Sequence, residues 1–99
     1  MAAKSLDIHP AALKEAISAV QWYLVRNETA ATKFAAELDR AVDLIVETPA
    51  RWPLGEHATR KFVLQRFPYA IIYREKEKTV EVFAIAHGHR RPSYWKKRL

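Results

Sequence analysis

Two stretches in the first half of the chain repeat apolar residues at steps of three and four, which is the spacing of an amphipathic helix. The first follows Pro10, a residue suited to the first turn of a helix, and runs from Ala11 to about Arg26. Its predicted apolar stripe comprises Leu13, Ala16, Ile17, Val20 and Leu24, and its predicted solvent side comprises Lys14, Glu15, Ser18 and Gln21. The second stripe comprises Phe34, Leu38, Ala41, Val42 and Ile45. Asn27 and Thr29 interrupt the pattern between the stripes and Thr48-Pro49 ends it, so we expect a helical hairpin.

The second half of the chain changes to the shorter period of β-strands. Apolar and polar residues alternate from Lys61 to Arg66, Tyr69 to Arg74 is a denser apolar run, and Thr79 to Ala86 is β-branched and apolar. The connections, Phe67-Pro68 and Glu75 to Lys78, are short enough for hairpins. We therefore expect an antiparallel meander of three strands, preceded by a loop that contains prolines and a glycine.

These elements predict a single α+β domain that spans residues 1–99. A short alternating segment from Ser5 to His9 precedes the first helix and is expected to join one edge of the sheet. The order is therefore β-α-α-β-β-β followed by a C-terminal tail, with the N-terminal helical hairpin packed on one face of a small antiparallel sheet. A chain of this length has room for one hydrophobic core and no second domain. The opposite face of the sheet is left open to a ligand or a partner.

The composition excludes several classes of protein. The chain has no cysteine, which removes disulfides and thiolate metal sites. It has no apolar run of membrane length, and its N-terminus lacks the apolar segment of a secretory signal, so we expect a cytoplasmic protein that does not enter a membrane. It contains no glycine-rich phosphate loop, nucleophile elbow or carboxylate pair, and the pair His87-x-His89 lacks further ligands. We therefore expect neither a cofactor nor a metal.

The positive charge is concentrated in the second half of the chain. Residues 1–50 hold 5 Lys and Arg against 7 Asp and Glu, whereas residues 51–99 hold 12 against 4. The first half thus carries a charge of −2 and the second +8, which together make the net charge of +6. A concentrated positive surface suits a polyanion, because neutralising phosphates releases their counterions, and it suits an acidic protein equally well.

The densest cluster of chemistry-bearing residues runs from His87 to Arg98 and contains no acidic residue. A metal-free ribonuclease needs a base for the 2′-hydroxyl, an acid for the leaving oxygen and a cation for the phosphorane. The candidate catalytic residues are His87, Arg90 and Tyr94, with Arg90 stabilising the phosphorane and His87 or Tyr94 moving protons. Two simpler interpretations stay open. His87 could be a strand-end histidine without a chemical role, and Tyr94 and Trp95 could pack at the edge of the core.

Other cations extend the positive field around this cluster and are the candidate RNA-binding or target-binding residues. They are Arg60, Lys61, Arg66, Arg74, His89, Arg91, Lys96, Lys97 and Arg98. Arginines form bidentate contacts with phosphates, and neighbouring aromatic residues can stack on unpaired bases. Some of the cations on the strands could instead be solvated edge charges that discourage aggregation between sheets.

Several segments, in order along the chain, carry a resemblance to a known family. They are Pro49, Trp52-Pro53, Phe67 to Arg74 and Val82 to Pro92. Together with the helical hairpin before them, these segments resemble the RelE/ParE superfamily of type II toxins, of the plasmid-stabilisation type. The resemblance implies a small toxin encoded with an antitoxin, whose acidic, partly disordered segment wraps the toxin and covers its basic face.

Two activities are known in this superfamily, and the residues match neither branch fully. In the branch that cleaves messenger RNA on the ribosome, the arginine after the last strand corresponds to Arg90 and one lysine of the preceding strand to Lys61. Ala70 stands where that branch has an arginine, and Val63 where it has a second lysine. Tyr94 lies close to the place of its C-terminal tyrosine, but not in the same register. The other branch poisons DNA gyrase by binding it, and does not usually end in a tail of this kind.

From the sequence we expect a toxin that inhibits growth by ribosome-dependent mRNA cleavage and that is, if an enzyme, a metal-independent endoribonuclease. One alternative is a ParE-like poison of DNA gyrase without catalytic activity. Another is a degenerate homologue that only binds an antitoxin. The expected partners are accordingly a cognate antitoxin and, as the target, either the ribosome with its mRNA or DNA gyrase.

Overall fold

The computed structural model describes residues 4–99, and it confirms the predicted order β-α-α-β-β-β. The helices are α1 (Pro10–Arg26) and α2 (Glu28–Glu47). The strands are β1 (Ser5–Ile8), β2 (Arg60–Val63), β3 (Tyr69–Glu75) and β4 (Thr79–His87). The described chain also contains short 3-10 helices, which are η1 (Pro49–Arg51), η2 (Glu56–Ala58) and η3 (Tyr94–Arg98). None of the described helices is long and apolar enough to cross a membrane.

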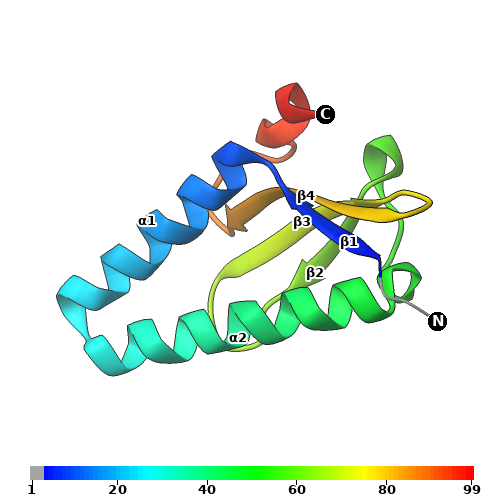
Figure 1. Cartoon of the computed structure of the whole chain (residues 1–99). Helices are drawn as coiled ribbons and strands as arrows, with labels where there is room; N and C mark the ends of the chain where they lie inside the picture. The colour runs from blue at the N-terminus through cyan, green and yellow to red at the C-terminus, as the bar shows by residue number, and fades with distance from the viewer. Residues whose placement is uncertain (1–3) are drawn as a thin grey trace.

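The described strands form one sheet in the order β1-β4-β3-β2 (Figure 1). The meander is antiparallel as predicted, and Ile71 on β3 pairs with Phe62 on β2 and with Ile85 on β4. β1 joins the edge of the sheet as predicted, but it runs parallel to β4, with Leu6 beside Val80, so the sheet as a whole is mixed. A parallel neighbour needs a long connection, and here both helices and two strands lie between β1 and β4.

Side chains at the helix ends define the hairpin. His9 precedes α1, and its Nδ1 accepts a hydrogen bond of 3.0 Å from the backbone N–H of Ala11. Asn27 serves both helices: its backbone N–H donates to the carbonyl of Tyr23 at 2.6 Å, and its Oδ1 accepts from the N–H of Ala30 at 3.0 Å. A side-chain cap of this kind stabilises a helix start by about 1 kcal/mol. Asn27, in an extended conformation, is the single residue between the two helices.

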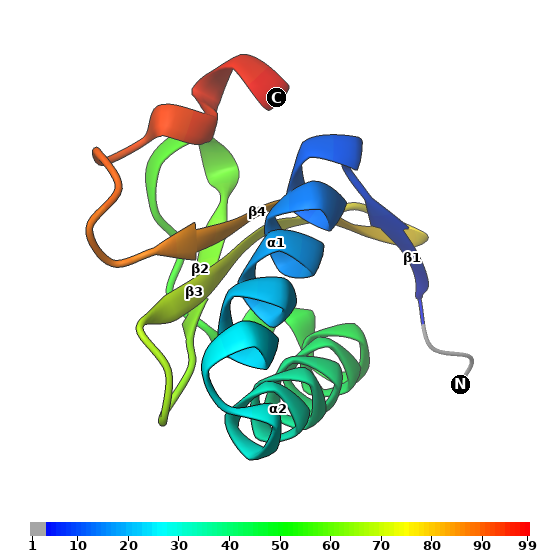
Figure 2. The same cartoon turned by 90° about the vertical axis from the view of Figure 1, so that its left-hand side faces the viewer.

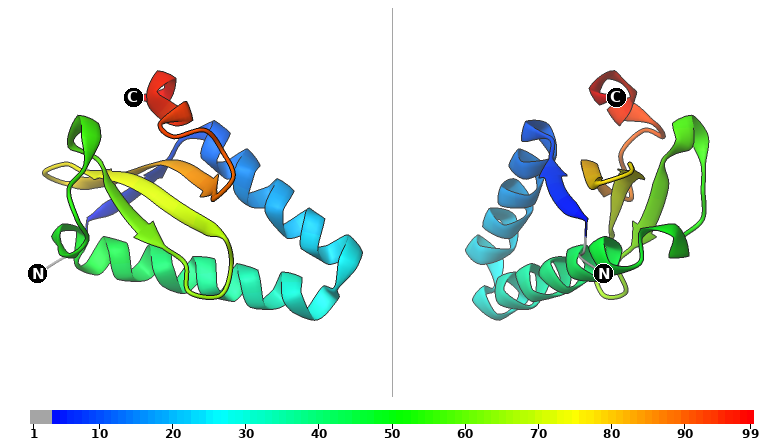
Figure 3. Two further views of the ribbon diagram at one scale, coloured as in Figure 1. Left: turned by 180° about the vertical axis from the view of Figure 1, so that it is seen from behind. Right: turned by 45° about the vertical axis from the view of Figure 1, so that its right-hand side comes forward.

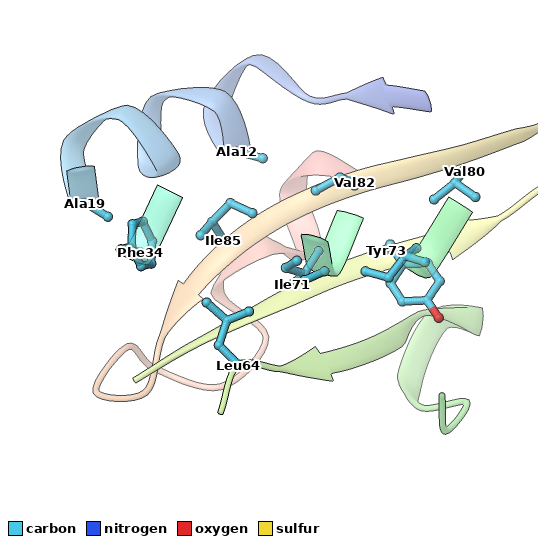
Figure 4. Close-up of a cluster of buried hydrophobic side chains, with 11 residues drawn as sticks. Ala12, Ala19, Phe34, Leu64, Ile71, Tyr73, Val80, Val82 and Ile85 are labelled. Carbon is cyan, nitrogen blue, oxygen red and sulfur yellow. The ribbon is translucent and has the colours of Figure 1, made fainter. Parts of the chain in front are cut away.

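The two helices cover one face of the sheet and enclose the main hydrophobic core (Figure 2). Its fully or nearly fully buried residues outside α1 are Phe34, Ala41, Ile45, Leu64, Ile71, Tyr73, Val80, Val82 and Ile85, most of which Figure 4 shows. The hydroxyl of Tyr73 donates to the carbonyl of Pro49 at 2.5 Å, so this buried polar group has a partner. The bond also joins β3 to η1, the turn that follows α2.

The side of α1 that enters the core differs from the predicted stripe. Ala12 and Ala19 are buried, whereas Leu13, Ile17 and Leu24 are 49%, 48% and 53% exposed. The prediction that these three larger residues face the core is therefore wrong. Alanine side chains let the backbone of a helix lie close to a sheet, and dense packing against β4 favours the side of α1 that carries them.

The opposite face of the sheet is covered in part by the C-terminal segment. Ile72 on β3 and Ala84 on β4 are buried there together with Trp95 of η3. The tail beyond Pro92, whose conformation the sequence left open, thus includes a 3-10 helix, and Figure 3 shows it near the loop that carries η2. The face that we expected to be open is therefore open only beside this segment.

Candidate functional site

The uncovered part of this face is a cleft of about 660 Å³. Its floor includes Ala70 and Ile72 from β3 and Ala86 from β4. One wall is the loop that runs from Pro53 to Glu56, and the other is the turn after β4 together with the start of η3. Two of these three residues are alanines, and their short side chains leave the space above the sheet unfilled.

The two walls of the cleft touch each other. The Ser93 hydroxyl donates to the Glu56 carboxylate at 2.9 Å, and the ring of His57 lies edge-on to that of Trp95 with 6.4 Å between the centroids. Ser93, His57 and Ala58 each have a φ of 58°, in the left-handed region that is costly for residues other than glycine. Residues in the left-handed region thus lie on both sides of this contact.

Cations surround the cleft. Lys61 on β2 and Arg90 and Arg91 after β4 line it, and all three are exposed. Arg60 also lines it, but its guanidinium donates to two carbonyl groups of the preceding loop, at 2.7 and 3.3 Å. Glu56, which is bound to the opposite wall, is the acidic residue of the lining. A short uncharged floor inside a positive rim favours a partner that carries negative charge.

A second groove, of about 520 Å³, separates α1 from the end of β4. Its α1 side includes Trp22 and Tyr23. The groove shares five residues with the cleft, namely Pro68, Tyr69, His87, Arg90 and Tyr94. The structure thus brings the three candidate catalytic residues together at the place where the two hollows meet.

His87 and Arg90 lie in one turn at the end of β4. The His87 ring is edge-on to Tyr69, with 5.0 Å between centroids, and stacks on His89 at 5.1 Å. Its Nδ1 accepts a 3.0 Å hydrogen bond from the backbone N–H of His89, an arrangement that needs this nitrogen unprotonated. The backbone N–H of Arg90 donates to the carbonyl of His87 at 3.0 Å, and its guanidinium lies 3.9 Å from the centre of the Tyr94 ring. The turn therefore presents an imidazole and a guanidinium at one edge of the cleft.

The hydroxyl of Tyr94 is bound to a carboxylate on the helix side of the sheet. It donates to Oε2 of Glu15, on α1, at 2.6 Å. Burial, together with the hydrogen bond to Glu15 and the charge of that carboxylate, raises the pKa of Tyr94 to about 12. The hydroxyl therefore keeps its proton near neutral pH and donates it in the hydrogen bond to Glu15, which makes Tyr94 a poor proton donor to a bound substrate.

Glu15 also closes the open edge of β4. β1 pairs with β4 only as far as Val82, so beyond it the backbone groups on this side of β4 have no strand partner. The N–H of Ile85 donates to Oε1 of Glu15 at 3.0 Å, and the carbonyl of Phe83 accepts from Nη1 of Arg98 at 2.9 Å. Arg98 and Glu15 form an ion pair through N–O contacts of 2.8 and 3.0 Å. Burial raises the pKa of Glu15, but the hydrogen bonds that the carboxylate accepts outweigh it and lower the pKa below its ordinary value.

The remaining predicted binding residues lie outside both hollows. Those that are exposed are Arg66, His89, Lys96 and Lys97. Arg74 is in the second half of β3, away from the cleft, and pairs with Glu81 at 3.3 Å. Arg98 is held by Glu15 and so faces the protein itself. Of the cations predicted to bind a target, Lys61, Arg60 and Arg91 are the ones that line the cleft.

Glu15 is the residue at this site that sequence analysis missed, because it was assigned to the solvent side of α1. Its partners Ile85, Tyr94 and Arg98 are 70 to 83 residues away along the chain, so no local pattern marks it. Within residues 4–99, no group of three or more His, Cys, Asp or Glu side chains is arranged to hold a metal ion.

Comparisons with known proteins identify the family. The protein family described as the ParE toxin of the type II toxin–antitoxin system parDE matches residues 6–92 of this chain. A chain of the solved chromosomal ParDE toxin–antitoxin system from P. aeruginosa has the same fold, with a TM-score of 0.75 and 19% identity over 85% of this chain and 95% of that one. No curated protein sequence matches the chain. The family match includes both helices and the meander and confirms the resemblance to the RelE/ParE superfamily, so the chain belongs to the ParE toxin family of type II toxin–antitoxin systems.

Proposed function

We propose that this toxin acts by binding and poisoning DNA gyrase, without catalysing the cleavage of RNA. The observation that carries the proposal is the hydrogen bond of Tyr94, because its hydroxyl, one of the two groups that could move protons in an RNA-cleaving site, donates instead to Glu15 at 2.6 Å. The match to the ParE family supports the same target class. From the sequence we expected RNA cleavage, with gyrase poisoning as the alternative, so the proposal reverses that order.

The floor of the cleft supports binding more than catalysis. Ala70 stands where the RNA-cleaving branch of the superfamily has an arginine, and Ile72 and Ala86 beside it are also uncharged. A phosphorane is stabilised by cations directed at it, and these three floor residues supply none. An apolar floor inside a positive rim suits a protein partner that inserts an apolar side chain and brings acidic groups to the rim.

RNA cleavage is the second candidate, because His87 and Arg90 lie in the same turn at the edge of the cleft. In that mechanism Arg90 would stabilise the phosphorane and His87 would move the protons without help from Tyr94. Lys61 and Arg91 on the rim would hold the phosphate backbone.

Membership of a toxin–antitoxin family implies an antitoxin as partner. We propose that an acidic segment of the antitoxin occupies the cleft and neutralises Lys61, Arg90 and Arg91 on its rim. Both the antitoxin and gyrase would meet the toxin in the cytoplasm, which is the location expected from the sequence. Competition between antitoxin and target for the same rim accounts for neutralisation of the toxin.

A gyrase supercoiling assay with the purified protein tests this proposal. Wild-type protein is expected to stop supercoiling and to trap cleaved DNA on gyrase, whereas Arg90→Ala needs a much higher protein concentration for the same effect and keeps its unfolding temperature. Lys78→Ala removes an exposed positive charge from the hairpin between β3 and β4 and is the matched control. Normal supercoiling in the presence of wild-type protein would contradict the proposal.

Primer extension on a defined message in a reconstituted translation reaction, with and without ribosomes, tests the second candidate. Ribosome-dependent cuts together with unaffected gyrase would show that RNA cleavage is the activity. An intact message together with unaffected gyrase would identify a degenerate homologue that only binds its antitoxin.

A further inference from the structure

Glu15 joins parts of the molecule that are widely separated in sequence. Its carboxylate, on α1, accepts hydrogen bonds of 2.6 to 3.0 Å from Ile85 on β4 and from Tyr94 and Arg98 on η3. The pair with Arg98 is largely buried, with 16% of each side chain exposed. Burying two charges costs free energy even when they are paired, and an apolar contact would attach the tail at lower cost. This cost points to a role for the carboxylate beyond attachment.

Closing the edge of β4 explains the bonds to Ile85 and Arg98, but not the bond to Tyr94. The Tyr94 ring is the surface on which the guanidinium of Arg90 lies, 3.9 Å from its centre. Within residues 4–99, Arg90 takes part in no ion pair, and its guanidinium makes no hydrogen bond. An exposed arginine without such a support samples many rotamers, so the ring is what orders this one.

We propose that Glu15 is a positioning residue that holds Arg90 ready for its partner by fixing the ring of Tyr94. The inference rests on the proposed function in one respect, because it takes Arg90 as a contact to the target. An arginine that is ordered before binding loses less conformational entropy when a carboxylate meets it, so Glu15 raises affinity without touching the partner. Tyr94 lies beyond residues 6–92, which the family match covers, so the arrangement depends on this chain's own C-terminal segment.

NMR of the Arg90 side chain tests this placement without any target. The ring current of Tyr94 shifts the Arg90 δ protons upfield, and the wild-type protein is expected to show the shift. In Glu15→Gln, which keeps the size of the side chain but removes its charge, these protons are expected to move back toward the position of an unstacked arginine. Glu47→Gln, the same replacement at an exposed position of α2, is expected to leave them unchanged. Equal Arg90 shifts in the wild type and in Glu15→Gln would overturn the proposal.

Gyrase inhibition by four proteins separates positioning from general support of the fold. They are the wild type, Glu15→Gln, Arg90→Ala and the double variant. Glu15→Gln alone is expected to weaken inhibition by roughly tenfold, as when one well-placed charged contact is impaired. In a protein that already carries Arg90→Ala, Glu15→Gln is expected to cause no further loss of gyrase inhibition. It is expected to lower the unfolding temperature by the same amount in the wild type and in Arg90→Ala. A further tenfold loss in the double variant would mean that Glu15 supports only the fold, and would overturn the proposal.

Tyr94→Phe provides a second route if Glu15→Gln does not fold. It removes only the hydroxyl that Glu15 binds, and it is expected to change the Arg90 shift and to weaken inhibition in the same direction. A Tyr94→Phe protein with wild-type Arg90 shifts would overturn the proposal. Full gyrase inhibition by Arg90→Ala would instead contradict the proposed function, and the NMR comparison would still decide the role of Glu15.

Discussion

The two faces of the sheet are formed by the same strands, but their side chains differ in size. On β3, Ile71 and Tyr73 enter the core under the helices and are 0% exposed, while Ala70 and Ile72 belong to the opposite face. Large side chains fill the helix-covered face, whereas the opposite face keeps a cleft of about 660 Å³. Because side chains alternate along a strand, one strand supplies both the core and the site. Substitutions can therefore change stability and target binding separately.

Phe34→Ala is expected to cause the largest loss of stability. Phe34 is fully buried, and the rings of Tyr23, Phe67 and Tyr69 surround it at centroid distances of 5.2 to 5.3 Å. Removing the ring leaves a cavity and costs about 3–5 kcal/mol of unfolding free energy. Urea denaturation measures this loss, and the molecules that stay folded should inhibit the target as the wild type does. A loss below about 1 kcal/mol would show that the neighbouring rings collapse into the space.

Trp95→Ala applies the same test to the opposite face and is expected to cost less, about 3 kcal/mol, which is the low end of the range for such a change. Trp95 packs on Ile72 and Ala84 from one side only, and η3 can move away from the sheet more easily than a core helix can. Because η3 also forms a wall of the cleft, target inhibition should fall together with stability. A stability loss as large as that of Phe34→Ala would remove the contrast between the two faces.

Tyr73→Phe is expected to cost about 1–2 kcal/mol. It removes the hydroxyl that donates to the carbonyl of Pro49 at 2.5 Å and leaves that acceptor without its partner. The change lies on the helix-covered face, so inhibition per folded molecule should stay at the wild-type level. Thermal denaturation and the supercoiling assay check the two parts. Reduced inhibition by fully folded Tyr73→Phe would show that a change in the core alters the cleft through β3.

The smallest effect on stability is expected from lowering the pH. The pKa of Glu15 is lower in the folded protein than the ordinary value of about 4.3, so its contribution to stability is complete above that value and is lost as the pH falls through the folded pKa. Between about pH 5 and pH 3, the wild type should therefore lose more stability than Glu15→Gln does. Urea denaturation at a series of pH values compares the two proteins, in which the other carboxylates contribute alike. Parallel curves would contradict the low pKa.

Element positions were predictable to within a few residues because their signals are local, although the strand expected over Lys61 to Arg66 ends at Val63. The helix expected from Ala11 begins at Pro10, and the strand expected over Thr79 to Ala86 ends at His87. Which side of α1 is buried was not predictable in the same way. Leu13 is more hydrophobic than Ala12, yet Ala12 enters the core because the distance between helix and sheet suits a small side chain.

The sequence by itself determined the order of the elements, the antiparallel meander, the concentration of positive charge and the resemblance to a toxin family, since these depend on residue types and on near neighbours in the chain. It also singled out Arg90 within a basic C-terminal cluster. Only the tertiary structure decided that β1 runs parallel to β4 and that Glu15 binds Tyr94 and Arg98. These contacts join residues more than 70 positions apart, so no local pattern marks them. The pair of Glu15 and Arg98 lies where β1 ends early and leaves an edge of β4 that side chains from α1 and η3 close.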